Sequence, residues 1–325
     1  MAAQQLRLPP LPTIRDLIRL YKLRALKQLS QNFLMDERIT DKFVKAAGKI
    51  HNNYICEVGP GPGAITRSII KRCPKKLIVV EKDPRFLPTL ELLQEASQGF
   101  TDMQIEIGDI RSYNFEVGFQ NNIKYDWLGL VPPIHLVGNL PFSVSTILLV
   151  DWLNAISQKR SAWLFGRSTM TLTFQKEVAE RIVAQVTEKQ RCRLSVMCQM
   201  WCDVDYKFTI PGTAFVPKPD VDVGVVTLIP KKYPLVDLPF AMVEKVVRTV
   251  FNMRQKHCRR GVEVLFPKDL RETLGPRLFQ LADVDFTARP FELSNEEFAR
   301  VCYAYKMLSD QYPEIDGYNF RASKQ

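Results

Sequence analysis

The chain has few residues that bind metal ions and no long apolar run. Its 325 residues include three histidines and seven cysteines, and no Cys-x-x-Cys pair occurs. Cys192, Cys198 and Cys202 form a cluster without the spacing of a disulfide framework. We therefore expect no metal site, and we expect reduced, buried cysteines in a reducing compartment. No apolar run approaches the roughly 18–20 residues that a membrane-spanning helix needs, so we expect no membrane span.

Internal repeats and low-complexity tracts are also missing from the sequence. The apolar fraction of 46% is that of a folded globular protein, and the length allows one large domain or two smaller ones. Lysine and arginine number 45 against 35 acidic residues, which gives a net charge of +10. This surplus favours a polyanionic partner, which could be RNA, DNA or an anionic membrane surface.

The N-terminal 29 residues are rich in basic side chains and carry the single acid Asp16. Ile14, Leu17, Ile18 and Tyr21 recur at helical spacing, which predicts an amphipathic helix. Such a segment is typical of a mitochondrial import sequence. It is equally typical of a basic arm that packs on the domain or lies on nucleic acid. One segment can serve both purposes, and both interpretations stay open.

Short apolar runs alternate with helical patterns through the first half of the chain. We predict strands at Tyr54–Val58, Leu77–Glu81, Met103–Ile107 and Ile134–Gly138, and helices at Ala64–Arg72, Phe86–Ala96 and Ser145–Asn154. Such alternation predicts an α/β fold, a Rossmann-like parallel sheet with helices on both faces. Right-handed crossovers then bring the loops that follow the strands to one edge of the sheet.

The second half of the sequence changes character twice. From Thr169 to Ile229 the pattern is β-rich, interrupted by a helix-like stretch at Gln175–Val186. After a break at 231–234 it is mostly helical to about Asp310. We therefore expect a basic arm at 1–29, a main domain at 30–234, a smaller helical domain at 235–310, and a polar, loosely held tail at 311–325.

A glycine loop follows the first predicted strand. Gly59-x-Gly61-x-x-Ala64 also fits the fingerprint of a dinucleotide site, which makes a nicotinamide-dependent dehydrogenase a competing interpretation. A pyrophosphate needs backbone N–H donors from this loop, and Pro60 and Pro62 have none. S-adenosylmethionine carries no phosphate, so a loop without these N–H donors can still bind it.

Two acids follow the next two predicted strands. Glu81 ends the second strand, where a carboxylate can bind ribose hydroxyls. Asp109 ends the third strand and could accept a hydrogen bond from the adenine amine of the cofactor. Together with the glycine loop, these acids favour a site for S-adenosylmethionine.

Asn139-Leu140-Pro141-Phe142 follows the fourth predicted strand and suits the exocyclic amine of a flat base. The side-chain oxygen of Asn139 and the backbone carbonyl of Leu140 could hold both N6 hydrogens of an adenine, so that the nitrogen lone pair points at the methyl group. Pro141 stiffens the turn, and Phe142 offers a stacking face worth roughly 1–3 kcal/mol. Most of the rate then comes from placing nitrogen and methyl in line, without a strong general base.

The ordered motifs resemble those of the ribosomal RNA adenine N6-dimethyltransferases, from about Leu26 to Arg300. The motifs that carry the resemblance are Gln31–Leu34, Glu57–Gly63, Glu81–Asp83, Gly108-Asp109, Asn139–Phe142, Phe174–Arg181, Phe215–Val221 and Leu293–Phe298. The run from Tyr21 to Ser30 looks like the mitochondrial branch of the family more than the bacterial one. Phe142 and Val223 depart from the family, where many members have tyrosine and serine.

The resemblance implies a class I S-adenosylmethionine-dependent methyltransferase that places two methyl groups on each of two adjacent adenines. The target would be a hairpin loop near the 3′ end of the small-subunit rRNA, in the mitochondrial matrix, in support of ribosome assembly. The cofactor site would comprise Gln31, Asn32, Leu34, Gly59, Gly61, Glu81, Lys82, Asp109 and Asn139. Asn139, Leu140 and Phe142 would act on the target base, with Phe215 as the second face of an aromatic sandwich around it.

The RNA backbone would be bound by basic side chains outside this site. Candidates are Lys22, Arg24, Lys27, Arg181, Lys218, Arg254, Lys256, Arg259 and Arg260. We expect a monomer that acts on the rRNA hairpin or on the assembling small ribosomal subunit. An alternative is an accessory factor of the mitochondrial transcription machinery that binds nucleic acid and keeps an idle methyltransferase fold.

Overall fold

The computed structural model describes residues 11–23, 31–119 and 123–320, which form two compact units. Unit 1 contains the described residues up to Ala179 together with Val204–Lys232, and unit 2 contains Glu180–Asp203 and the described residues from Tyr233 onward. The chain therefore enters unit 2 twice. The sequence-based division differs here, because it kept residues 180–203 within a main domain at 30–234.

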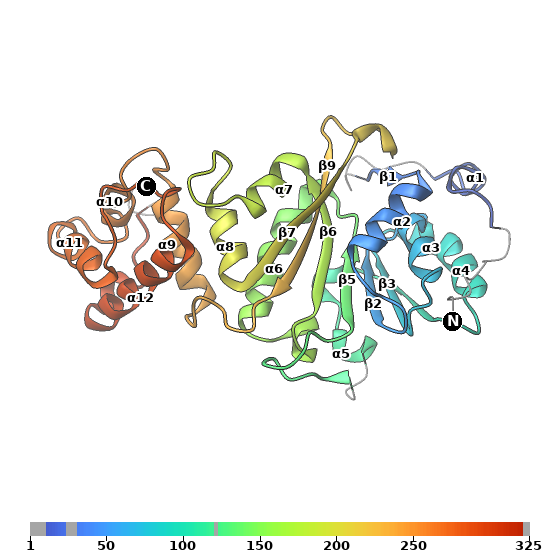
Figure 1. Ribbon diagram of the computed structural model, residues 1–325, viewed down its shortest axis with the longest axis horizontal. Coiled ribbons are helices and arrows are strands. Elements are labelled where there is room, and N and C mark those ends of the chain that lie inside the picture. The colour runs from blue at the N-terminus through green and yellow to red at the C-terminus, as the bar shows by residue number, and fades with distance from the viewer. Residues whose placement is uncertain (1–10, 24–30, 120–122, 321–325) are drawn as a thin grey trace. The chain divides into compact units, whose positions relative to one another are not determined.

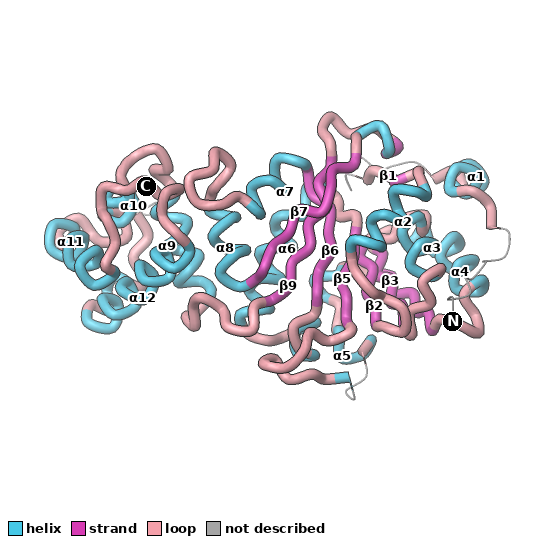
Figure 2. The backbone as a smooth tube through the Cα atoms, viewed as in Figure 1, coloured by secondary structure: helices cyan, strands magenta, loops and turns pink. Residues whose placement is uncertain are grey.

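Unit 1 is built on a sheet with the strand order β4-β3-β2-β5-β6-β9-β7 (Figure 1). Neighbouring strands are parallel from β4 through β6, and β9 is antiparallel to β6. The strands are β2 (Tyr54–Val58), β3 (Lys76–Glu81), β4 (Asp102–Ile107), β5 (Ile134–Gly138), β6 (Thr169–Gln175), β7 (Cys202–Ile210) and β9 (Val223–Pro230). In Figure 2 they lie side by side as one sheet. The Rossmann-like fold that the sequence predicted is confirmed.

A second, two-stranded sheet pairs residues that are far apart in the sequence. It consists of β1 (Phe33–Leu34) and β8 (Phe215–Val216), which run antiparallel. Phe33 is the register partner of Val216, and Leu34 is that of Phe215. The segment just before α2 is thereby fixed to the segment that precedes β9.

Helices connect the strands of unit 1 and make up most of unit 2. Those of unit 1 are α1 (Ile14–Leu20), α2 (Glu37–Ala46), α3 (Ala64–Ile70), α4 (Leu87–Ala96), α5 (Phe115–Gly118) and α6 (Phe142–Ser157), and α7 (Lys176–Val183) runs from unit 1 into unit 2. Those of unit 2 are α8 (Arg193–Trp201), α9 (Phe240–Phe251), α10 (Cys258–Glu263), α11 (Arg271–Ala282) and α12 (Asn295–Gln311).

The strand order reverses direction between β2 and β5. From β2 the chain moves outward through β3 to β4, and from β5 it moves outward to β6 on the other side. Right-handed crossovers then place α3 and α4 on one face and α6 on the other. In open α/β sheets such a switch point opens a crevice at the carboxyl ends of the strands, where ligands bind.

The described part of the N-terminal arm packs on unit 1. Helix α1 begins with a capping box between Thr13 and Asp16, so the predicted helix is confirmed. Leu17 is 1% exposed, and Leu23 joins the apolar cluster that also contains the β1 residues. These residues therefore match the interpretation as a packed arm, and the import interpretation stays a prediction.

Helix α8 was missed by the sequence reasoning, which expected β-structure around it. Every residue from Ser195 to Trp201 is buried, so the segment lacks the polar face that marks an amphipathic helix. Its run of apolar residues looked like a buried strand for that reason.

The C-terminal segment is also held more firmly than the sequence suggested. Ile315 is completely buried, and its carbonyl accepts hydrogen bonds from Lys245 Nζ at 2.9 Å and Tyr305 Oη at 2.8 Å. The expectation of a loosely held tail is therefore wrong for these residues, and 321–325 lie outside the described residues.

Membrane and metal-binding features can be stated for the described ranges. Within 11–23, 31–119 and 123–320, each helix is too short or too polar to cross a membrane. The same ranges hold no group of three or more His, Cys, Asp or Glu side chains placed to bind a metal ion. All seven cysteines are free, and Cys56, Cys198, Cys202, Cys258 and Cys302 are buried.

Candidate active site

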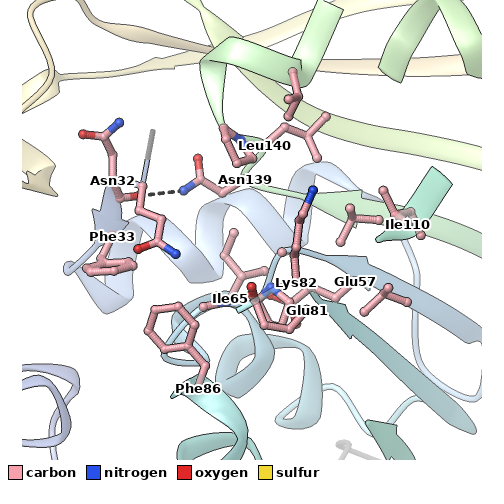
Figure 3. A pocket seen from close by; sticks show the side chains of 18 of the residues that line it. Asn32, Phe33, Glu57, Ile65, Glu81, Lys82, Phe86, Ile110, Asn139 and Leu140 are labelled. Atoms are coloured by element: carbon pink, nitrogen blue, oxygen red, sulfur yellow. Dashed lines mark hydrogen bonds between the residues drawn. The ribbon is translucent and has the colours of Figure 1, made fainter. Parts of the chain in front are cut away.

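A cavity of about 260 Å³ lies at the carboxyl ends of β2, β3, β4 and β5 in unit 1. It has room for a small organic molecule rather than a single water. Its wall includes eleven of the predicted site residues: Gln31, Asn32, Leu34, Gly59, Gly61, Glu81, Lys82, Asp109, Asn139, Leu140 and Phe142. Figure 3 shows side chains from separate loops around this cavity. The loops after separate strands therefore meet at one site, as predicted.

The glycine loop is tied to the acid at the end of β3. The backbone N–H of Gly61 donates to Glu81 Oε2 at 2.9 Å, and the N–H of Asp83 donates to Glu81 Oε1 at 2.8 Å. Burial raises the pKa of Glu81, and these backbone donors act in the opposite direction. One N–H that a pyrophosphate would need is thus already bound to a carboxylate, which disfavours the dinucleotide interpretation.

Glycine is required at the point where this loop enters α3. Gly63 has a φ of +85°, a left-handed conformation that side chains rarely adopt. A Cβ atom there would lie 2.3 Å from Leu93 Cδ1. The left-handed backbone therefore favours glycine at this position, and any other residue would also have to displace the end of the Leu93 side chain.

Glu57 lies on the cavity wall with one carboxyl oxygen unsatisfied. It is 1% exposed, and its Oε2 has no hydrogen-bond partner among the described residues. Burial raises the pKa of Glu57 to about 8, Thr66 acts in the opposite direction, and the charge of Glu81 raises the pKa further. A buried acceptor without a partner is costly, so this atom fits a ligand that brings a donor or a positive charge.

Asp109 shares the wall with two cationic partners. Its Oδ2 lies 3.0 Å from both Arg111 Nη2 and Lys82 Nζ. The hydrogen bonds from Arg111, followed by those from Lys82, hold the pKa of Asp109 well below its usual range. Asp109 is thus a permanent anion with a fixed orientation, and Lys82 contributes to the site by pairing with it.

Asn139 is held by two hydrogen bonds at the end of β5. Its Nδ2 donates to the backbone carbonyl of Asn32 at 3.0 Å, a bond drawn in Figure 3. Its Oδ1 accepts a hydrogen bond from Thr173 Oγ1 at 2.8 Å. An amide oxygen has two lone pairs, so one acceptor position on Asn139 remains for a ligand.

Aromatic and aliphatic side chains complete the wall. Phe33 and Phe86 meet edge to face with ring centroids 5.5 Å apart, and both belong to the apolar cluster of unit 1. Phe142 is half-buried and packs against the same cluster. The cavity therefore joins an apolar side to a polar side formed by Glu57, Glu81 and Asp109, in keeping with ligand sites in general.

Phe215, the predicted second face of the aromatic sandwich, is not on this wall, and the sandwich stays a prediction. Its ring is 2% exposed and belongs to the apolar cluster against which Phe142 packs. Pairing of β8 with β1 places Phe215 beside Leu34. A base could not stack on Phe215 as its ring lies here, so Phe142 is the predicted stacking residue that lies at the cavity in this structure.

The candidate RNA-binding residues are distributed over both units. Lys22 and Lys218 are exposed on unit 1, Lys256 is exposed on unit 2, and Arg181 is half-buried on α7. Arg24 and Lys27 lie outside the described residues. The three exposed lysines fit the predicted role of binding phosphate groups.

The arginines of the basic cluster in unit 2 have partners within the chain. Arg254 donates to the carbonyls of Arg191 at 3.0 Å and Lys189 at 2.6 Å, and its guanidinium lies 4.8 Å from the ring centroid of Phe291. Arg259 and Arg260 lie 2.6 and 3.6 Å from Glu263 carboxylate oxygens. Arg254 therefore holds the 189–191 turn through its hydrogen bonds, and its contact with RNA stays a prediction.

Three residues of the site escaped the sequence reasoning as individual side chains. Glu57 was noted only as the start of the glycine motif. Its neighbours in the sequence did not indicate that burial would raise the pKa of its carboxyl group. Phe86 was placed in a helix without a role. Thr173 was not singled out in the β-rich stretch, and its bond to Asn139 depends on the pairing of β5 with β6.

Known proteins with the same features identify the family. The family described as ribosomal RNA adenine dimethylase matches residues 22–298. The chain is 52% identical over 315 residues to dimethyladenosine transferase 1, mitochondrial, of Xenopus tropicalis, covering 97% of this chain and 90% of the relative. It is 54% identical over 322 residues to the protein of that name from Drosophila pseudoobscura pseudoobscura, with 98% and 93% covered.

A solved structure shows the same fold. The crystal structure of a dimethyladenosine transferase from Plasmodium falciparum superimposes with a TM-score of 0.62 at 22% identity, covering 85% of this chain and 98% of that chain. The fold is therefore that of the class I methyltransferases, as predicted. With a family match along most of the chain and relatives more than half identical to it, the chain belongs to the ribosomal RNA adenine dimethylase family, the enzyme class that its ordered motifs predicted.

Proposed function

We propose that this enzyme dimethylates the N6 atoms of two adjacent adenines in a hairpin loop near the 3′ end of the mitochondrial small-subunit rRNA. The methyl donor in this proposal is S-adenosylmethionine. The observation that carries the proposal is the common cavity wall of Glu81, Gly61 and Asn139. A cofactor held by the first two residues would reach a base held by the third.

The residues of the cavity fit S-adenosylmethionine. Glu81 presents a fixed carboxylate, Asp109 presents a second one, and Glu57 offers a buried acceptor that has no partner among the described residues. Glu81 and Asp109 would hold the ribose and the adenine, and Gln31, Asn32 and Leu34 would contact the methionine end. S-adenosylmethionine supplies a methyl group on a positively charged sulfur, which is an electrophile that needs no further activation.

The base would be held on the other side of the cavity. An adenine amine is a poor nucleophile because its lone pair is delocalised into the ring. Asn139 Oδ1 and the backbone carbonyl of Leu140 would accept its two N6 hydrogens, and Phe142 would stack on the ring. The nitrogen lone pair then points at the methyl group, so that most of the rate comes from alignment. No strong base is required, because the methylated nitrogen is acidic.

The same acceptors allow the second methylation. Each transfer breaks one carbon–sulfur bond, forms one carbon–nitrogen bond and releases one N6 proton to solvent. After the first transfer the amine keeps one N–H, and a single acceptor is enough to orient it. Two acceptors that act independently can thus serve both the unmodified and the monomethylated adenine.

The place of action follows from the relatives and the charge. Relatives more than half identical to this chain are named mitochondrial, and the net charge of +10 suits an RNA partner. We place the reaction in the mitochondrial matrix, where the enzyme acts as a monomer on the free hairpin or on the assembling small ribosomal subunit. An idle, purely nucleic-acid-binding protein is disfavoured because Glu81, Asp109 and Asn139 all stand on the cavity wall.

Methyl transfer from labelled S-adenosylmethionine to a synthetic hairpin tests the proposal. The hairpin copies the 3′ end of the small-subunit rRNA, and a matched hairpin carries guanines in place of the two loop adenines. We expect label on the adenine hairpin alone and N6,N6-dimethyladenosine on digestion. Equal labelling of both hairpins, or no labelling of either the hairpin or the assembled subunit, would overturn it.

A further inference from the structure

We infer that Thr173 is a positioning residue of the active site, which sets the amide of Asn139 so that its oxygen faces the target amine. The inference rests on the proposed function of Asn139 as an acceptor for the adenine N–H. Thr173 lies on β6, outside the cavity wall and outside the loop motifs. It would act through Asn139 without touching either substrate.

The geometry of the sheet places Thr173 beside Asn139. Strands β5 and β6 are parallel, and their last register pair joins Gly138 to Leu172. Asn139 and Thr173 each follow that pair by one residue, so they stand level where β5 ends and β6 continues. Thr173 is completely buried, and its Oγ1 donates to Asn139 Oδ1 at 2.8 Å.

Two bonds together determine which way the amide points. The Asn32 carbonyl can only accept, so it attracts the Nδ2 end of Asn139, 3.0 Å away. The Thr173 hydroxyl donates to the Oδ1 end. If the amide were rotated by half a turn, Oδ1 would meet the Asn32 carbonyl, acceptor against acceptor. The hydroxyl also occupies one lone pair of Oδ1, which leaves the other in a fixed direction.

This fixed direction has a chemical consequence. A donor to Oδ1 slightly weakens it as an acceptor, so Thr173 does not strengthen the bond to the base. Its effect is geometric, because it limits rotation of the Asn139 side chain about its terminal bond, which is otherwise broad. Alignment of nitrogen and methyl is what the proposed reaction depends on, so loss of the hydroxyl should lower kcat more than it weakens substrate binding.

The chain offers a matched control on the same strand. Thr171 lies two residues before Thr173 on the same face of β6 and is 1% exposed. Its Oγ1 lies 3.2 Å from Thr227 Oγ1, away from Asn139. Thr171→Val and Thr173→Val each remove one buried hydroxyl, and Thr173→Ser keeps the hydroxyl that the inference needs.

The test compares these three variants with the wild type in steady-state methylation of the adenine hairpin, in calorimetric binding of S-adenosylmethionine, and in thermal unfolding. We expect Thr173→Val to lower kcat by about tenfold relative to Thr171→Val, with KM and cofactor affinity within twofold. Thr173→Ser should recover most of the activity. A similar kcat for the two valine variants, or failure of the serine variant to recover activity, would overturn the inference.

A readout without turnover separates this inference from the proposed function. Protein labelled with ¹⁵N-asparagine gives a side-chain amide signal for Asn139, assigned by its loss in Asn139→Ala. We expect this signal to shift in Thr173→Val and to stay in place in Thr173→Ser and Thr171→Val. An unchanged signal in Thr173→Val counts against the inference, whereas an inactive wild type with the expected shifts counts against the proposed function alone.

Discussion

The backbone N–H of Gly61 donates to Glu81 Oε2 at 2.9 Å, which joins the glycine loop after β2 to the acid that ends β3. Glu81 also accepts from the N–H of Asp83, so both carboxylate oxygens are fixed before a ligand binds. Because each oxygen keeps a further lone pair, the carboxylate can still accept from ligand hydroxyls. The loop and the acid therefore form one preorganised unit.

Replacing Glu81 by alanine should weaken cofactor binding by several-fold or more. The variant loses the carboxylate that would hold the ribose, and the Gly61 N–H loses its acceptor. Isothermal titration of S-adenosylmethionine measures the effect, and Glu91→Ala on the exposed side of α4 serves as the control. Equal affinities for the two variants would remove Glu81 from the cofactor site.

Asn139→Ala should abolish methyl transfer while the protein stays folded. The substitution removes the proposed acceptor for the target amine. It leaves the Thr173 hydroxyl and the Asn32 carbonyl without their partner, which costs about 1–3 kcal/mol for each group that no water reaches, so we expect a destabilised but folded protein. Labelled methyl transfer and thermal unfolding, compared with Asn154→Ala on α6, check both parts. Near-normal turnover by Asn139→Ala would refute the mechanism.

Glu57→Gln should change how stability depends on pH. Because burial raises the pKa of Glu57 from 4.5 to about 8, its contribution to stability is complete below about pH 4.5 and is lost as the pH rises towards 8. Glutamine does not titrate, so the wild type should lose stability relative to the variant across this window, by at most about 1.4 kcal/mol per pH unit.

Denaturant unfolding of both proteins between pH 5 and 8 measures this difference, since groups common to both cancel. Glu91→Gln, which changes an exposed acid, is the control and should track the wild type. Parallel curves for wild type and Glu57→Gln would mean that Glu57 titrates normally in the folded protein.

The double variant Lys218→Ala/Lys256→Ala should bind the hairpin more weakly and with less dependence on salt. Both lysines are exposed, and each phosphate that is no longer neutralised reduces the slope of log affinity against log salt by about 0.7–0.9. Affinity measured over a series of salt concentrations gives the slope. Lys207→Ala/Lys306→Ala removes two lysines that pair with Asp205 and Asp310, and serves as a charge-matched control. Identical slopes for the two double variants would place the RNA elsewhere.

Arg254→Ala should destabilise the protein more than it weakens RNA binding. The guanidinium donates to two backbone carbonyls and lies over Phe291, and hydrogen bonds from charged groups contribute about 1.5–3 kcal/mol. Denaturant unfolding should show that Arg254→Ala loses more free energy of unfolding than Lys256→Ala, because the Lys256 side chain is exposed. If both variants are equally stable, Arg254 does not support the 189–191 turn.

The sequence predicted the parts of the fold that local patterns encode. The strands at Tyr54–Val58 and Ile134–Gly138 have the predicted bounds, because each is a short, mostly buried run that stops at a glycine or just before one. Helix α8 could not be found in this way, since burial all round removes the periodicity on which helix prediction depends. The grouping of 180–203 with unit 2 depends on long-range packing, which has no local signal.

The candidate site also combines features that local sequence patterns predict with features that depend on long-range packing. Residues at or just after strand ends, such as Glu81 and Asn139, could be placed because the topology fixes where these ends meet. Thr173 and the burial of Phe215 depend on strand pairing across long stretches of sequence. The partners of Arg254 are backbone carbonyls, which every residue has, so no sequence pattern could reveal them.

The β1–β8 pair has a consequence for the order of events at the site. Leu34 lies on the cavity wall, and its register partner Phe215 is covered by apolar neighbours. A movement of β8 that uncovers Phe215 for a base would also displace β1, the strand that carries Leu34. Two ligands that act on the two strands of one small sheet share a single coupling free energy. If binding of the methyl donor changes the affinity for RNA by some factor, binding of RNA changes the affinity for the methyl donor by the same factor.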